Sequence, residues 1–175
     1  MGRIVNIVGD KSTGKTLLSM EAIANFFLKY DNGRCWYNEA EAAFDTDYAK
    51  ALGIPMHRVE KLESYDTVEA VVEHLVGVLE RIKGPGLYIL DSLDALSDEA
   101  EMGRGIRDSS YGAGKAKKMS ELFRRLVRRV KQKQICVMII SQVRDNIGVT
   151  FGEKHGWSGG KALDFYASQV LWLAH

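Results

Sequence analysis

The stretch Gly9-Asp10-Lys11-Ser12-Thr13-Gly14-Lys15-Thr16 lies between an apolar run, Ile4 to Val8, and an amphipathic stretch, Leu17 to Tyr30. It fits the pattern G-x-x-x-x-G-K-S/T at every position. The expected strand before it and helix after it are the structural context in which this pattern binds phosphate. The backbone N–H groups of such a loop surround a phosphate, and the helix N-terminus adds partial positive charge. We therefore predict that these eight residues bind a nucleotide, with Lys15 on the β- and γ-phosphates and the Thr16 hydroxyl on Mg²⁺. The alternative is a glycine-rich turn without a ligand.

The length and composition predict one globular domain spanning residues 1–175. The chain is 46% hydrophobic and 27% charged, with two prolines and no repeat, which is ordinary for a single core of this size. No apolar run approaches the length of a membrane span, and we expect no membrane partner. Cys35 and Cys136 are far apart in apparent strands, which favours buried thiols in a reducing cytoplasm over a disulfide or a metal site.

Short apolar strands alternate with amphipathic helices along the whole chain. The expected strands are Arg3–Val8, Arg34–Asn38, Val59–Leu62, Leu87–Asp91, Gln134–Ser141 and Gln169–Leu173, and the expected helices are Lys15–Tyr30, Asp47–Leu52, Thr67–Ile82 and Lys115–Lys133. This alternation predicts an α/β fold with a mostly parallel, twisted sheet and helices on both faces. Ligands of such sheets bind at the carboxyl ends of the strands.

Three carboxylates follow the expected strands at these ends. Asp91 ends a strand downstream of the phosphate loop, so we predict that it helps Thr16 to hold Mg²⁺. Glu39 and Glu41 follow the second strand, and either could orient the water that attacks a γ-phosphate. The spacing alone does not choose between them.

The near-neutral net charge of +1 conceals a basic second half. Residues 1–100 hold 10 Lys/Arg and 17 Asp/Glu, whereas residues 101–175 hold 14 and 6. The basic residues are densest in the expected helix Lys115–Lys133, with nine Lys/Arg against one Glu. Two long glycine-containing segments, Asp98–Gly114 and Asp145–Gly160, lie in the same half, and segments of this length are often functional. A polyanionic partner is one interpretation; a merely solvated face is the other.

Several stretches together resemble the bacterial RecA recombinase family. They are residues 35–45 (CWYNEAEAAFD) with Tyr48-Ala49 and Leu52-Gly53 after them, residues 90–96 (LDSLDAL), residues 142–152 (QVRDNIGVTFG) and residues 159–168 (GGKALDFYAS). The similarity runs in order through nearly the whole chain. The last two stretches are the most specific, because phosphate-loop ATPases in general do not share them. The family also has segments before and after the region matched here, so the chain is expected to correspond to the ATPase core.

The resemblance implies roles for matching residues around ATP and Mg²⁺. Glu41 would be the catalytic carboxylate, assisted by Lys15. Tyr48 would stack on adenine, and Asp45 would contact the adenine amino group. Gln142 would lie next to the γ-phosphate and pass the nucleotide state to the loop that follows, on a strand between those that end at Gly9 and Asp91.

The resemblance also implies that the two glycine-containing segments bind single-stranded DNA. The matching positions are Tyr111 in the first segment, Ser120 and Arg124 on the basic helix, and Arg144, Ile147, Gly159, Gly160 and Lys161 in or beside the second. The residue types suit this role, since glycine N–H groups and basic side chains bind phosphates, and apolar or aromatic side chains contact bases.

These observations lead us to expect a DNA-dependent ATPase of recombination and repair, which couples ATP hydrolysis to homologous strand exchange. Like subunits in a filament are expected partners if the flanking segments are supplied. Two alternatives share the phosphate loop. One is another ATPase of the same fold, such as a ring helicase or a signalling ATPase. The other is a nucleotide-binding interaction module without turnover.

Overall fold

The structure is a computed structural model that describes residues 1–41, 43–62, 65–97, 112–145, 155–157 and 160–174. Within these residues, six parallel strands form one sheet in the order β3-β2-β4-β5-β1-β7, and a short strand, β6, pairs antiparallel with β5. The strands are β1 (Arg3–Gly9), β2 (Arg34–Glu39), β3 (Val59–Leu62), β4 (Gly86–Asp91), β5 (Ile135–Asp145), β6 (His155–Trp157) and β7 (Gln169–Leu173).

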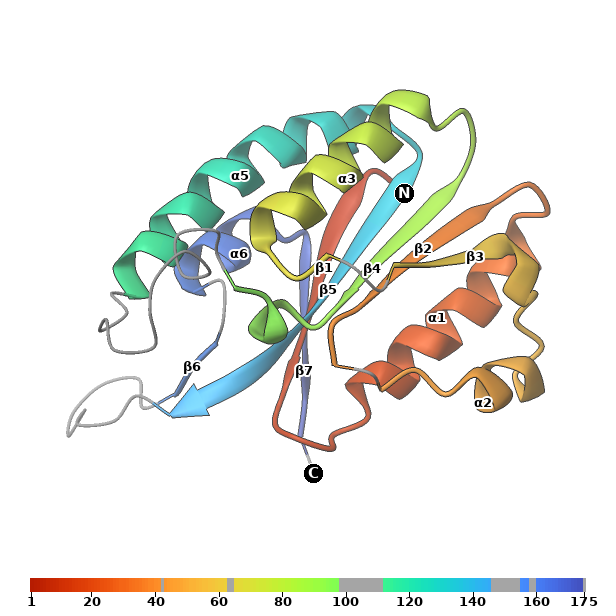
Figure 1. Ribbon diagram of the computed structural model, residues 1–175, viewed down its shortest axis with the longest axis horizontal. Coiled ribbons are helices and arrows are strands. Elements are labelled where there is room, and N and C mark those ends of the chain that lie inside the picture. Colours follow the sequence, from red (N-terminus) through yellow and green to blue (C-terminus); the bar gives the residue numbers. More distant parts are fainter. Residues whose placement is uncertain (42, 63–64, 98–111, 146–154, 158–159, 175) are drawn as a thin grey trace.

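Helices cover both faces of the sheet (Figure 1). They are α1 (Lys15–Lys29), α2 (Thr46–Ala51), α3 (Val68–Arg81), α5 (Gly112–Gln132) and α6 (Gly160–Tyr166), with short 3-10 turns η1 (Met56–Arg58) and η2 (Leu93–Ala95). α3, α5 and α6 lie on one side of the sheet, and α1 and α2 lie on the other.

Alternating side chains of the central strands fill two hydrophobic cores, one on each face. On one face, Tyr88 and Leu90 of β4 pack with α3 and α5; on the other, Leu87 and Ile89 pack with α1. Every residue of β4 is buried, as expected for a parallel strand that helices cover on both faces. Together the two cores hold the carboxyl ends of β1, β2, β4 and β5 at one edge of the sheet.

The fold predicted from the sequence is confirmed, including the position of β5 between β1 and β4. Several element boundaries differ from the prediction. β5 does not end at Ser141 but continues to Asp145, because its last residues pair with β6. The expected loop 98–114 overlaps α5, which already begins at Gly112, since isolated glycines within a helical pattern are tolerated.

The expected loop 145–160 likewise contains β6 and the first residue of α6. Among the described residues, no helix is long and apolar enough to cross a membrane.

Candidate nucleotide-binding site

The phosphate loop leaves the sheet at the carboxyl end of β1, between β5 and β7. Gly9 pairs in register with Gln142 of β5 and with Leu173 of β7. A Cβ atom at Gly9 would lie 2.5 Å from Oγ1 of Thr13 and 2.8 Å from the carbonyl oxygen of Leu173, so a side chain here would overlap both. The missing side chain therefore lets the loop fold back closely over the end of the strand.

The loop turns into α1 through residues with left-handed backbone geometry. The φ angle is 63° at Ser12 and 84° at Gly14, which is the N-cap of α1. Inside the loop, the Thr13 hydroxyl donates to the carbonyl oxygen of Asp10 at 2.9 Å, and the Lys11 N–H donates to Oδ1 of Asp10 at 2.7 Å. These bonds close the loop into a compact turn in front of the helix.

The N-terminus of α1 has the features of an anion-binding site. No side chain caps it, and its first turn contains no acidic residue, so the helix N–H donors and the positive end of its dipole stay available. The Lys15 side chain is buried, with 8% exposed, and its ammonium donates to the carbonyl oxygen of Asp10 at 2.5 Å. Backbone donors and an ammonium group thus lie together, which suits the phosphates of a nucleotide.

A hydroxyl and a carboxylate suited to Mg²⁺ lie directly behind the loop. Oγ1 of Thr16 donates to Oδ2 of Asp91 at 2.7 Å, and the Tyr37 hydroxyl donates to the same oxygen at 2.6 Å. Burial raises the pKa of the Asp91 carboxyl; the hydrogen bonds from Tyr37 and Thr16 oppose this rise. Mg²⁺ prefers oxygen ligands of this kind, so the residues present fit the ion that the sequence implies.

Both carboxylate oxygens of Glu39 bind other groups of the protein, which disfavours a role in activating water. Its Oε1 accepts the Phe44 N–H at 2.7 Å, and its Oε2 forms an ion pair with Lys61 at 2.8 Å. Both oxygens of Glu39 are therefore bound to the protein.

Glu41 instead lies among the polar groups that follow β4 and β5. Its Oε1 accepts hydrogen bonds from the Ser92 hydroxyl and from Nε2 of Gln142, the latter at 2.8 Å. Ser92 follows Asp91 directly, and Gln142 lies beside Gly9. The fold thus brings Glu41 and Gln142 into direct contact at the edge of the sheet that carries the phosphate loop.

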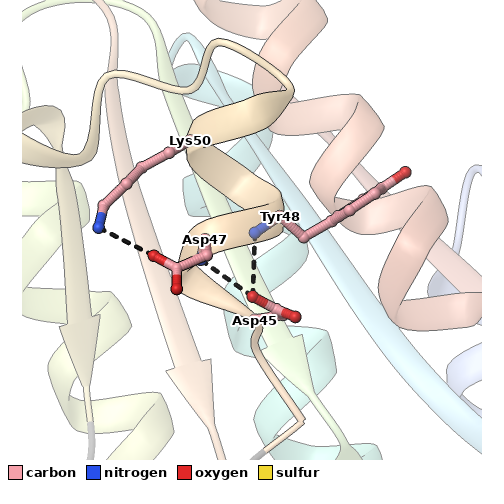
Figure 2. A network of polar contacts seen from close by, with 4 residues as sticks. All are labelled: Asp45, Asp47, Tyr48 and Lys50. Carbon is pink, nitrogen blue, oxygen red and sulfur yellow. Dashed lines mark hydrogen bonds and ion pairs between the residues drawn. The ribbon is translucent and has the colours of Figure 1, made fainter.

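Asp45 and Tyr48 lie at the start of α2, on the same face of the sheet as α1. Oδ1 of Asp45 accepts the N–H groups of Asp47 and Tyr48, both at 2.9 Å, and so caps the helix (Figure 2). The Tyr48 side chain is 41% exposed and extends away from the ion pair between Asp47 and Lys50. The base-binding roles of Asp45 and Tyr48 stay predictions.

Comparison with known proteins identifies the family. The sequence matches the profile described as "RecA N-terminal domain" over residues 1–173. The chain belongs to the RecA family. Protein RecA of Delftia acidovorans is 36% identical over 170 residues, which cover 97% of this chain and 45% of that protein. The chain therefore spans less than half the length of this curated relative.

The residues of this RecA-family chain that were predicted to bind DNA are only partly within the described structure. Ser120 and the exposed Arg124 lie on α5. Arg144 lies in β5, opposite Gly156 of β6, and Gly160 and Lys161 begin α6. Tyr111, Ile147 and Gly159 lie outside the described residues. The DNA-binding roles of all these residues stay predictions.

The exposed face of α5 keeps much of its positive charge. Arg125 pairs with Glu121 at 2.6 Å, and Arg129 reaches Glu80 of α3 at 3.4 Å. Arg124 and Arg128 are also exposed and form an ion pair with none of the described acidic residues. The helix thus presents guanidinium groups to solvent that a polyanion could bind.

Sequence reasoning did not identify Tyr37 and Ser92 as members of the site. The alternation along β2 places Tyr37 on the same face as Glu39, which was the available signal. The sequence does not reveal its partner, because Asp91 lies on another strand, 54 residues away. Ser92 adjoins Asp91, but its bond to Glu41 depends on how β2 and β4 pair.

Proposed function

We propose that this chain is the ATPase core of a RecA-type recombinase, which binds ATP with Mg²⁺ and hydrolyses it in response to single-stranded DNA. The observation that carries the proposal is the position of Glu41, hydrogen-bonded to Gln142 at the strand ends that carry the phosphate loop. Glu39, the alternative carboxylate, has both oxygens occupied.

The proposed chemistry assigns one role to each polar group at the carboxyl ends of β1, β2 and β4. The loop N–H groups and Lys15 would bind the phosphates, and Thr16 with Asp91 would hold the metal ion. Mg²⁺ held there would supply positive charge that offsets the negative charge of the phosphates. The Glu41 carboxylate orients a water molecule in line with the γ-phosphate and accepts its proton as the oxygen–phosphorus bond forms. ADP leaves with the bridging oxygen.

DNA binding is assigned to the basic surface that follows the site in sequence. Gln142 contacts the catalytic carboxylate, and Arg144 lies two residues further along the same strand. A change in the partner of Gln142 would therefore act on the strand that leads to the proposed DNA contacts. Coupling of this kind needs two states of one element, each favoured by a different ligand. Strand exchange and filament formation with like subunits belong to the same proposal.

A pair of substitutions at neighbouring carboxylates tests the assignment of the catalytic residue. Glu41→Gln should lower the rate of ATP hydrolysis by about 10²–10⁴-fold, the usual contribution of a general base, and should leave ATP binding in place. Glu39→Gln is the matched control, because it neutralises a carboxylate two residues away that binds Lys61; it should lower stability and largely spare the rate. Phosphate release measures the first effect, and thermal unfolding measures the second. Equal loss of rate in both variants would contradict the assignment.

Lys15→Ala tests the pocket itself. The variant should fold, by circular dichroism, and should fail to bind a fluorescent ATP analogue, because the ammonium that faces the phosphates is gone. Unchanged ATP hydrolysis in this variant would refute the assignment of the nucleotide-binding site.

Two results on the wild-type protein would favour the alternative functions. Directional unwinding of duplex DNA would indicate a helicase of the same fold. Tight ATP binding without hydrolysis, with or without DNA, would indicate an interaction module.

A further inference from the structure

A further carboxylate at the site, Asp94, binds the main chain of the residue proposed to sense the nucleotide. Oδ2 of Asp94 accepts the backbone N–H of Gln142 at 2.6 Å, while the side chain of Gln142 donates to Glu41. The two bonds join three elements: η2 after β4, β5, and the residues after β2. None of the roles proposed above uses Asp94.

The hydrogen bond from the Gln142 N–H to Asp94 lies where, among the described residues, no neighbouring strand accepts it. β5 pairs with β1 as far as Gln142, but its pairing with β4 ends at Ile139. On the β4 side, the backbone of Gln142 has thus passed the end of the neighbouring strand. The Asp94 carboxylate takes the place of a strand partner, and a charged acceptor makes the stronger kind of hydrogen bond.

The turn that carries Asp94 is firmly anchored. Leu93 and Leu96 on either side of it are buried in the core shared with α3 and α5. The N–H of Ser97 donates to the carbonyl oxygen of Asp66 at 3.0 Å, and the carbonyl oxygen of Ser97 accepts the N–H of Val68 at 3.0 Å. Asp94 therefore holds Gln142 from a rigid part of the fold.

We propose that Asp94 is a positioning residue, which fixes the main chain of Gln142 so that a change of partner at its side chain is transmitted along β5 toward the DNA contacts. The inference rests on the proposed function and adds a component to it. With the main chain fixed, a move of the Gln142 amide from Glu41 to a γ-phosphate must be accommodated by the residues that follow. Without the bond to Asp94, the main chain of Gln142 itself can shift and absorb the change.

The test compares the affinity for labelled single-stranded DNA in two nucleotide states, by fluorescence anisotropy. The measured quantity is the ratio of affinities with a non-hydrolysable ATP analogue plus Mg²⁺ and with ADP plus Mg²⁺. Asp94→Ala should lower this ratio by roughly tenfold, since a hydrogen bond to a charged group changes an equilibrium by about that factor or more. If the wild-type ratio is itself below roughly ten, the ratio in the variant should fall to one. Asp94→Asn keeps an acceptor oxygen and should retain most of the ratio.

Asp66→Ala is the matched control, because it removes an exposed carboxylate from the adjoining turn without touching Gln142. Amide hydrogen exchange supplies a local readout: the Gln142 N–H should exchange roughly tenfold faster in Asp94→Ala and should be unaffected in Asp66→Ala. If Asp94→Ala does not fold, Asp94→Ser replaces it, with a shorter, uncharged side chain that removes the carboxylate acceptor.

The inference is supported if the ratio of DNA affinities falls in Asp94→Ala and persists in both Asp94→Asn and Asp66→Ala. A wild-type ratio in Asp94→Ala overturns it and leaves the proposed function standing. Loss of nucleotide binding in Asp94→Ala also overturns it, because the residue would then act on the pocket rather than on coupling. A wild-type protein whose DNA affinity ignores the nucleotide overturns the proposed function, and the inference with it.

Discussion

Tyr37→Phe removes one hydroxyl group from a fully buried side chain and tests how Asp91 is held. The Tyr37 hydroxyl donates to Oδ2 of Asp91 at 2.6 Å, and the Asp91 side chain lies in the interior with 3% exposed. Burial raises the pKa of the Tyr37 phenol further above its ordinary value, so the phenol stays a neutral donor. At a pH above the pKa of the Asp91 carboxyl, the substitution removes a short hydrogen bond from a buried, ionised carboxylate.

The expected cost follows from the charge on the acceptor. Hydrogen bonds to charged groups contribute about 1.5–3 kcal/mol to stability, whereas neutral pairs contribute about 0.5–1.5 kcal/mol. Tyr88 provides the neutral comparison, since it is equally buried and its hydroxyl contacts Nδ1 of His74 at 3.2 Å and the carbonyl oxygen of Val71 at 3.5 Å. We expect Tyr37→Phe to lose about 1.5–3 kcal/mol of unfolding free energy and Tyr88→Phe at most about half as much.

Urea denaturation at pH 8 in the presence of a chelator measures both variants on the metal-free protein. The slopes with denaturant should match the wild type, because neither substitution changes the surface exposed on unfolding by much. A Tyr37→Phe variant within about 0.5 kcal/mol of the wild type, or one no less stable than Tyr88→Phe, would refute the reasoning that the phenol stabilises an ionised Asp91.

Two further predictions concern charge at other places in the fold. Burial lowers the pKa of His74, and nearby Arg81 adds to this effect while Glu60 opposes it; the folded state therefore binds a proton less readily than the unfolded chain. The contribution of this group to stability is fully present above the unfolded-state pKa of about 6.5 and is lost as the pH falls from there through the lower folded-state pKa. His74→Asn should therefore flatten the decline in unfolding free energy between pH 7.5 and 5.5. The control His57→Asn, at an exposed histidine, should leave this decline unchanged. A decline of the same size in His74→Asn would show that other groups cause it. Replacing both Arg144 and Lys161 with alanine should weaken binding to single-stranded DNA of any sequence. The slope of the logarithm of the binding constant against the logarithm of the salt concentration should become shallower by about 1.4, because each basic side chain that neutralises a phosphate of a single strand contributes about 0.7 to it. An unchanged affinity, measured by anisotropy over a salt series, would show that these two residues do not contact the DNA.

The phosphate loop and its frame were readable from the sequence because they are contiguous. Residues 9–16 adopt their turn through local features, namely glycines at two positions and polar side chains that bond within the loop. The same holds for most of the helices and strands, whose apolar periods fall on the faces that the two cores bury. The end of β5 and the bounds of the expected loop 145–160 were misplaced, because β6 is a three-residue strand whose pairing is not visible in local sequence.

Local sequence determined that the chain has a phosphate loop and an alternating α/β pattern, since both depend on residues a few positions apart. Tertiary structure decided which side chains meet around that loop. Asp91 is 75 residues from Thr16, and Gln142 is 101 residues from Glu41. The residues alone left Glu39 and Glu41 equivalent. The Phe44 N–H reaches Glu39 within the local segment after β2, whereas strand pairing places Lys61 on Glu39, and Ser92 and Gln142 on Glu41. Contacts of this kind depend on the order and register of parallel strands, which buried apolar surface selects for the chain as a whole.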